Sequence, residues 1–301
     1  MQPRWVIAGC RGQLGHALSG ELAASGCELA AAGDLPELDI ANRGGLARFF
    51  AGLAPPLVVV NSAAFTQVDS CEKPENHDAV WGANAEGPGL VAELCAERGF
   101  RLVHVSTDYV FAGDGTRPYR EDDPPAPRSE YGRSKLAGEQ RVLARCPSAL
   151  VVRTSWVFGR GRNFIAAILA QAQERRRKRD RTRLRVVDDQ RGRPTYAVDL
   201  AAGIRALVEA DARGLYHVAN RGEATWWEVA KASLDEAGFG DLQVDRIRTR
   251  DLNLRAPRPS YSVLDCSKAE ALGVRPRSWQ DALKAFLSSS DSPLAPDGKA
   301  A

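Results

Sequence analysis

No part of the 301-residue sequence is continuously apolar over the roughly 20 residues that a membrane-spanning helix needs. The first residues, Met1 to Ile7, run directly into an apolar stretch and lack the layout of a signal peptide. The sequence therefore predicts no membrane partner and favours a cytoplasmic protein.

Cysteine and histidine do not occur in metal-binding arrangements. The six cysteines are scattered and include no Cys-x-x-Cys pair, which favours reduced thiols over a disulfide framework or a zinc site. The four histidines have no metal-ligand spacing either. We therefore predict no metal site from the residues themselves.

A large excess of charge is also missing, because the formal net charge is only +3. One basic run, Glu174 to Arg183, suggests nucleic-acid binding at first sight. A single short run on a nearly neutral chain is weak support, and the simpler interpretation is a polar helix end that continues into a solvated loop. We expect no nucleic-acid partner.

What the sequence does contain begins at its amino end. An apolar strand, Trp5 to Ala8, leads directly into Gly9-Cys-Arg-Gly-Gln-Leu-Gly15 and then into a helical pattern over 16–25. Glycines at such a turn let the backbone approach a pyrophosphate, and the helix N-terminus supplies amide donors. The stretch predicts a dinucleotide site, although its G-x-x-G-x-x-G spacing differs from that of simple dehydrogenases.

A second strand, predicted over 27–32, ends at Gly33-Asp34. An acidic residue about 20 positions beyond the glycines is where a ribose hydroxyl is commonly held. Gly-Asp is equally a common turn pair. Asp34 is therefore either a ribose ligand or a turn residue, and the sequence leaves both interpretations open.

Strands and helices alternate over the first half of the chain, which predicts an α/β fold of Rossmann type, a doubly wound parallel sheet. We assign 1–155 to the dinucleotide-binding domain and 156–287 mainly to a smaller substrate-binding region, with some elements returning to the first domain. The end, 288–301, is rich in Ser, Pro, Ala and Gly and is predicted to be disordered. Further strands are expected at 56–61, 101–111, 149–153 and 215–218, and helices at 43–51, 77–98, 163–173, 199–209 and 225–237.

Tyr131 and Lys135 are four residues apart, so a helix would place them on one face. A tyrosine is a poor acid, with a pKa of about 10, and a neighbouring ammonium would lower that pKa. The pair can therefore serve as a proton donor. Tyr-x-x-x-Lys is common by chance and is weak evidence by itself. The glycine loop near the start of the sequence is what favours a catalytic role for this pair.

Together these motifs resemble those of the extended short-chain dehydrogenases/reductases and, within them, the dTDP-4-dehydrorhamnose reductases. The Tyr-x-x-x-Lys pair marks only the superfamily, whereas Ser106 to Phe111 and Val187 to Thr195 are more particular to the sugar-reductase branch. The resemblance extends to about Phe286. The other matching stretches are Gly9–Gly15, Leu38–Ile40, Val60–Thr66, Val68–Asp69, Ala83–Asn84, Arg153–Phe158, Gly161–Phe164 and Arg258–Leu264.

The resemblance implies roles for individual residues. Tyr131 would protonate the sugar oxygen as hydride arrives, and Lys135 would bind the nicotinamide ribose and hold the tyrosine pKa down. Thr107 would be the third catalytic residue and would contact the substrate carbonyl, and substrate contacts are also implied for Asp108 and Trp156. Cofactor contacts are implied or expected for Gly9, Arg11, Gly12, Gln13, Gly15, Asp34, Asp39, Ile40, Ala63, Ala64, Phe65, Val105, Tyr131 and Lys135.

The implied reaction is the reduction by NADH or NADPH of the C4 carbonyl of dTDP-4-dehydro-6-deoxy-L-mannose, which gives dTDP-L-rhamnose, a precursor of cell-surface polysaccharide. Leu35 follows Asp34 where many relatives carry arginine. We therefore expect the protein to use both cofactors and to prefer NADH. Arg11 would act against this preference if its side chain reached the 2′-phosphate of NADPH. Some members of the family form homodimers with a magnesium ion, so the resemblance alone implies Mg²⁺ and a homodimer here.

Two other functions stay open. One is a different nucleotide-sugar enzyme, a dehydratase or an epimerase. The 4,6-dehydratases carry Asp-Glu after the threonine, whereas here Thr107 is followed by Asp108 and Tyr109. The other is an idle dinucleotide-binding subunit resembling the regulatory subunit of methionine adenosyltransferase, against which the intact Thr107, Tyr131 and Lys135 argue.

Overall fold

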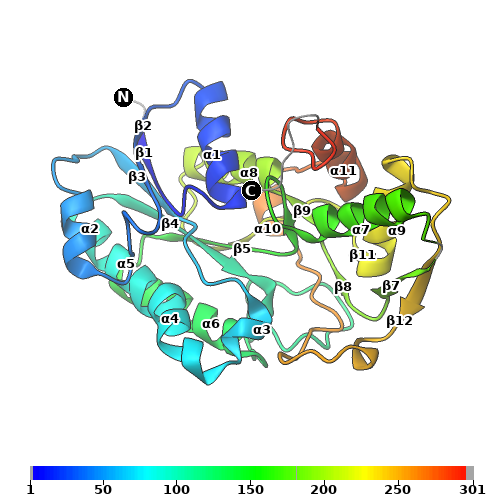
Figure 1. Ribbon diagram of the computed structural model, residues 1–301. Helices are drawn as coiled ribbons and strands as arrows, with labels where there is room; N and C mark the ends of the chain where they lie inside the picture. Colours follow the sequence, from blue (N-terminus) through cyan, green and yellow to red (C-terminus); the bar gives the residue numbers. More distant parts are fainter. Residues whose placement is uncertain (1–2, 181, 296–301) are drawn as a thin grey trace.

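A six-stranded parallel sheet lies at the centre of the computed structural model, which describes residues 3–180 and 182–295. The strand order is β10-β5-β4-β3-β1-β2 (Figure 1). Runs such as Leu-Val-Val-Val-Asn in β3 are buried throughout, as a sheet covered on both faces requires. The strands are β1 (Arg4–Ala8), β2 (Leu29–Gly33), β3 (Leu57–Asn61), β4 (Arg101–Thr107), β5 (Leu150–Thr154) and β10 (Gly214–His217).

Helices cover both faces of this sheet, because successive strand residues point to opposite sides. Trp5 and Ile7 pack against α1 (Gln13–Ala24) and α8 (Ala197–Glu209). Val6 and Ala8 face the core formed with α2 (Arg43–Phe49), α5 (Gly87–Arg98) and α6 (Glu130–Arg145). The predicted doubly wound α/β fold is confirmed. No helix in the described ranges has the length and apolar character needed to span a membrane.

A second, smaller lobe lies beside the sheet (Figure 1). Its core contains Phe158, Leu169, Val229 and Phe286. The lobe is built from α7 (Phe164–Lys178), α9 (Trp226–Glu236), α11 (Trp279–Leu287), β6 (Val157–Phe158), β7 (Leu184–Val187), β8 (Arg191–Gly192), β9 (Thr195–Tyr196), β11 (Ala224–Thr225) and β12 (Val244–Ile247). Short helices elsewhere are α3 (Val68–Cys71), α4 (His77–Trp81), α10 (Ser267–Glu270) and the 3-10 turns Pro74–Asn76, Asp108–Val110 and Thr249–Asp251.

The helix expected over 77–98 is interrupted. A π-helical segment, Gly82–Glu86, separates α4 from α5. The cause is tertiary, because α6 comes so close that a Cβ on Gly138 would lie 2.1 Å from the carbonyl oxygen of Asn84. The widened turn directs Asn84, which is fully buried, toward the edge of the sheet where β3 ends.

Part of the segment expected to be disordered has a defined structure. Residues 288–295 form consecutive turns, in which Ser292 is 3% exposed and Leu294 packs on the second-lobe core. The Asp291 carboxylate lies 3.4 Å from Nε2 of His16 on α1. Residues 296–301 lie outside the described residues. Two elements from the region beyond residue 156 return to the first domain, as expected: α8 packs on α1, and β10 pairs with β5. The domain boundary at 155–156 stays a prediction.

The basic run forms the last turn of α7 and the loop beyond it. Arg177 and Lys178 both pair with Glu174, and Arg176 pairs with Asp241. Cations at a helix C-terminus are favoured by the helix dipole. Helix geometry and surface ion pairs thus account for these residues, and Arg181 lies outside the described residues.

Candidate active site

The glycine loop after β1 forms a backbone cradle at the carboxyl edge of the sheet. Gly9 has a φ of +86°, and a Cβ there would lie 2.6 Å from the amide nitrogen of Ala63, which follows β3. A Cβ on Gly15 would lie 2.1 Å from the Gly9 carbonyl oxygen. Gly12, the N-cap of α1, brings no side chain to that helix end. A pyrophosphate fits this close approach of backbone at the amino end of a helix.

The loop lies at the point where the strand order reverses, because β1 is flanked by β3 on one side and β2 on the other. Ligands of open α/β sheets bind in the crevice at such a point. Gln13 connects the cradle to the second lobe through its Nε2, which donates to the carbonyl oxygen of Arg162 at 3.4 Å. This contact brings the second lobe next to the glycine loop.

Asp34 is both a turn residue and a candidate ribose ligand. One carboxylate oxygen accepts from the backbone N–H of Arg11 at 2.9 Å, and the other accepts from the backbone N–H of Leu35 at 2.9 Å. The side chain thereby ties the glycine loop to the end of β2. The ribose contact itself stays a prediction.

The residues predicted to lie near the adenine differ in exposure. The Asp39 carboxylate faces its own turn, where it accepts from the N–H of Ala41 at 2.9 Å. Ile40 is 4% exposed and belongs to the core. It packs against Gly87 so closely that a Cβ on Gly87 would lie 2.7 Å from the Ile40 side chain. Contact of Asp39 and Ile40 with the adenine stays a prediction.

The segment after β3, which contains Ala63, Ala64 and Phe65, begins against the glycine loop at Gly9 and is partly buried. Asn84 holds this segment with two hydrogen bonds, accepting from the N–H of Phe65 at 2.8 Å and donating to its carbonyl oxygen at 3.0 Å. Its amide also donates to Oγ of Ser134 on α6 at 3.1 Å. Asn84 thus connects the predicted cofactor channel to the helix of Tyr131. The expected roles did not include it, although it stood in one of the matching motifs.

The three predicted catalytic residues come together at the carboxyl edge of the sheet. Tyr131 and Lys135 lie on α6, and Thr107 is the last residue of β4. The Lys135 ammonium donates to the carbonyl oxygen of Val105 at 2.7 Å. The Thr107 hydroxyl donates to a carboxylate oxygen of Asp108 at 3.0 Å. The Tyr109 ring packs edge-on against Tyr131, with centroids 5.5 Å apart.

Burial dominates the protonation of these groups. It raises the pKa of Tyr131, and the neighbouring Thr107 hydroxyl offsets part of the rise. It lowers the pKa of Lys135 to about 8, against which the Glu139 carboxylate acts. The expectation that Lys135 lowers the pKa of Tyr131 is therefore wrong in this structure, because burial raises that pKa. Tyr131 is therefore held in its protonated form.

Asp108 is 2% exposed, and its carboxylate accepts a hydrogen bond from Thr107 instead of facing solvent. Burial raises the pKa of Asp108 to about 6, although the Thr107 and Ser262 hydroxyls act against the rise. Its second oxygen is buried without a hydrogen-bond partner among the described residues. The predicted substrate contact of Asp108 stays a prediction.

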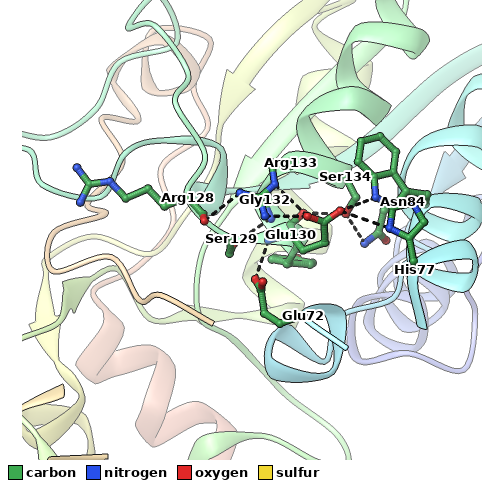
Figure 2. Close-up of polar contacts among 11 residues, drawn as sticks. Glu72, His77, Asn84, Arg128, Ser129, Glu130, Gly132, Arg133 and Ser134 are labelled. Atoms are coloured by element: carbon green, nitrogen blue, oxygen red, sulfur yellow. Dashed lines mark hydrogen bonds and ion pairs between the residues drawn. The ribbon is translucent and has the colours of Figure 1, made fainter. Parts of the chain in front are cut away.

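The amino end of α6 is anchored by hydrogen bonds around Ser129 and Glu130 (Figure 2). Ser129, 2% exposed, accepts from the N–H of Gly132 at 3.1 Å, and Glu72 of the segment after α3 accepts from the N–H of Glu130 at 2.7 Å. The Glu130 carboxylate accepts from Nε1 of Trp81 at 2.6 Å. These contacts fix the helical turn that carries the phenol.

Trp156 follows β5 at the border of the second lobe. Its φ of +49° is unusual for a bulky residue, and strained backbone of this kind tends to occur at functional sites. Its indole stacks on Trp226 with centroids 3.7 Å apart, and Nε1 of Trp226 donates to Gln190 at 3.1 Å. A Cβ on Gly192 would lie 2.6 Å from the Trp156 ring. Trp226 gave no signal in the sequence, because only the fold brings it to Trp156.

A buried ion pair lies one helical turn beyond Lys135. Glu139 on α6 accepts from Nε and Nη2 of Arg153 on β5, at 2.8 and 2.7 Å. Both side chains are 4% exposed. A paired, bidentate geometry is what makes such burial tolerable.

Other places in the fold offer less. A cavity of about 460 Å³ lies at the amino ends of β1, β3 and β4, lined by Trp5, Leu57 and Arg101 among others, on the edge opposite the glycine loop. Among residues 3–180 and 182–295, no group of three or more His, Cys, Asp or Glu side chains is arranged to hold a metal ion. The implied Mg²⁺ and homodimer stay predictions.

Comparisons with known proteins agree with the geometry. The family described as RmlD substrate binding domain matches residues 4–292. A dTDP-4-dehydrorhamnose reductase of Mycobacterium tuberculosis is 40% identical, covering 94% of this chain and 92% of its own. A probable dTDP-4,6-dihydroxy-2-methyloxan-3-one 4-ketoreductase of Streptomyces antibioticus is 41% identical, covering 93% of each.

A solved structure is also similar over nearly its whole length. It is the dTDP-4-dehydrorhamnose reductase of Bacillus anthracis in complex with NADP, which is 34% identical, has a TM-score of 0.86, and covers 95% of this chain and 99% of its own. With a family match that spans residues 4–292 and relatives at 40% identity, the chain belongs to the dTDP-4-dehydrorhamnose reductase family.

Proposed function

We propose that this protein uses NADH or NADPH to reduce the C4 carbonyl of dTDP-4-dehydro-6-deoxy-L-mannose, giving dTDP-L-rhamnose. One observation carries the proposal. Tyr131, Lys135 and Thr107 meet at the same edge of the sheet as the glycine cradle formed by Gly9 and Gly15. A proton donor and a dinucleotide cradle in one crevice are what carbonyl reduction requires.

The bound nicotinamide supplies the hydride for C4. Tyr131, which burial keeps protonated, donates its phenolic proton to the carbonyl oxygen as that oxygen becomes negative. The Thr107 hydroxyl donates to Asp108 in this structure and would turn its one proton to the same carbonyl when the substrate binds. Lys135, which lies one helical turn from Tyr131 and donates to the Val105 carbonyl, would bind the nicotinamide ribose. Hydride and proton together convert the ketone to an alcohol, so the electrons and protons balance.

Trp156 is proposed to contact the sugar. Its partial exposure, its strained backbone and the Trp226 ring stacked on one face support a rigid aromatic surface at the border of the crevice. Sugars commonly lie against such surfaces because the ring is large and loses little freedom on binding. The second lobe would then hold the substrate against the first.

Replacing Trp156 by alanine should raise the substrate KM by about tenfold, because a contact of roughly 1–2 kcal/mol is lost. The dissociation constant for NADH should stay unchanged, since the glycine cradle is untouched. Steady-state kinetics with a fluorescence titration of NADH measure both. Trp156→Phe should recover most of the loss, and a variant that unfolds would identify Trp156 as a core residue instead.

A second 4-keto sugar is the main competitor as substrate, because the Streptomyces antibioticus relative named for another sugar is 41% identical. The test is to mix the protein with NADH or NADPH and each enzymatically prepared 4-keto sugar, and to follow the loss of reduced-nicotinamide absorbance. The proposal predicts the higher kcat/KM with dTDP-4-dehydro-6-deoxy-L-mannose. Turnover with neither sugar would contradict it.

A further inference from the structure

The loop after β2 carries a carboxylate that pairs with the arginine of the glycine loop. Nη2 of Arg11 lies 2.9 Å from Oε2 of Glu37, and Nη1 donates to the carbonyl oxygen of Leu35. The hydrogen bond from Arg11 lowers the pKa of Glu37, so the pair is charged near neutral pH. The Arg11 side chain is thus held across the end of β2, next to Asp34.

This position matters for the choice of dinucleotide. The end of β2 is where the adenosine ribose of a bound dinucleotide lies, and a 2′-phosphate there needs a cation such as arginine. Leu35 supplies no charge. Among the described residues, Arg11 is the cation bonded to this loop. Its guanidinium binds the Leu35 carbonyl and the Glu37 carboxylate, and both bonds would compete with a bound 2′-phosphate.

We propose that Glu37 determines cofactor specificity by holding the Arg11 guanidinium and so disfavouring NADPH relative to NADH. The inference rests on the proposed use of a dinucleotide. Glu37 acts in two ways: it occupies the cation that a 2′-phosphate would use, and its charge adds to that of Asp34 in repelling the phosphate. Arg11 and Glu37 are 60% and 62% exposed, so the exchange of partners is easy and the effect is a tuning of preference rather than an exclusion.

The first test is Glu37→Gln, which keeps the length of the side chain and removes its charge. Titration calorimetry should show NADPH binding about threefold to fivefold more tightly, the range of exposed ion pairs, with NADH nearly unchanged. The probes 2′,5′-ADP and 5′-AMP, which differ by the 2′-phosphate, should follow the same pattern. The ratio of kcat/KM for the two cofactors should move by a similar factor.

Two further variants decide the mechanism. In Glu37→Gln combined with Arg11→Ala, the gain for NADPH should disappear, because no guanidinium remains to receive the phosphate. Glu174→Gln removes a carboxylate from a similarly exposed arginine pair in the second lobe and should leave both affinities unchanged.

An unchanged NADPH to NADH affinity ratio in Glu37→Gln would overturn the proposal, and so would a gain that persists without Arg11. The titrations contain no sugar. They therefore report on Glu37 whichever sugar the site reduces, and a failed reductase assay leaves their outcome intact.

Discussion

Replacing Tyr131 by phenylalanine should lower kcat by roughly a hundred- to ten-thousand-fold, the usual contribution of a positioned general acid. The substitution removes only the hydroxyl, and the ring still fills its place against Tyr109. Folding, the melting temperature and the affinity for NADH should therefore survive. Steady-state kinetics, thermal unfolding and a cofactor titration on the same preparation measure the three quantities.

The matched control is Tyr109→Phe, which makes the same chemical change on the ring that packs edge-on against Tyr131. Burial raises the pKa of both phenols, so acidity alone does not distinguish them. Of the two phenols, that of Tyr131 is hydrogen-bonded to the Thr107 side chain and lies one helical turn from Lys135, whereas Tyr109 contacts Thr107 through its backbone N–H. Tyr109→Phe should turn over close to the wild-type rate, and near-wild-type turnover of Tyr131→Phe would remove the general acid from the account.

The second large effect is expected on stability. Arg153→Met should reduce the free energy of unfolding by about 3–5 kcal/mol, because Glu139 stays buried without the partner that accounts for both of its short hydrogen bonds. Urea unfolding followed by circular dichroism gives the value, provided that the denaturant slope is unchanged. Activity should fall as well, since Glu139 is the carboxylate that acts on Lys135.

Two comparisons separate the buried charge from other causes. Arg153→Met combined with Glu139→Met removes both charges and should recover much of the lost stability. Arg177→Met breaks the exposed pair with Glu174 and should leave the unfolding free energy nearly unchanged. A single Arg153→Met variant as stable as wild type would show that the ion pair contributes little.

The sheet and the glycine cradle were predictable because each depends on local pattern. Apolar runs such as Leu57–Asn61 are buried on both faces of a parallel sheet and read as strands from composition. Gly9 and Gly15 stand in a strand–turn–helix context, and the structure shows close backbone approaches at both. The meeting of Tyr131 on α6 with Thr107 at the end of β4 was expected only from the resemblance to the reductases, because no local pattern places these two segments together.

The rest depends on contacts between segments far apart in the sequence. The π-helical turn at Asn84 results from the close approach of Gly138 on another helix. Trp226 lies 70 residues from Trp156, and Glu37 reaches Arg11 only because β2 pairs with β1. The pKa of Tyr131 was expected to fall because Lys135 is four residues away. The burial of the phenol, which depends on the fold, raises that pKa instead.

The central claim is that hydride passes from the nicotinamide to C4 of the sugar. The most direct test supplies reduced cofactor carrying deuterium at both C4 positions of the dihydronicotinamide, together with dTDP-4-dehydro-6-deoxy-L-mannose, and locates the deuterium in the product by NMR and mass spectrometry. The account predicts one deuterium at C4 of dTDP-L-rhamnose for each cofactor oxidised. A product without deuterium at C4, or no oxidation of the cofactor, would contradict it.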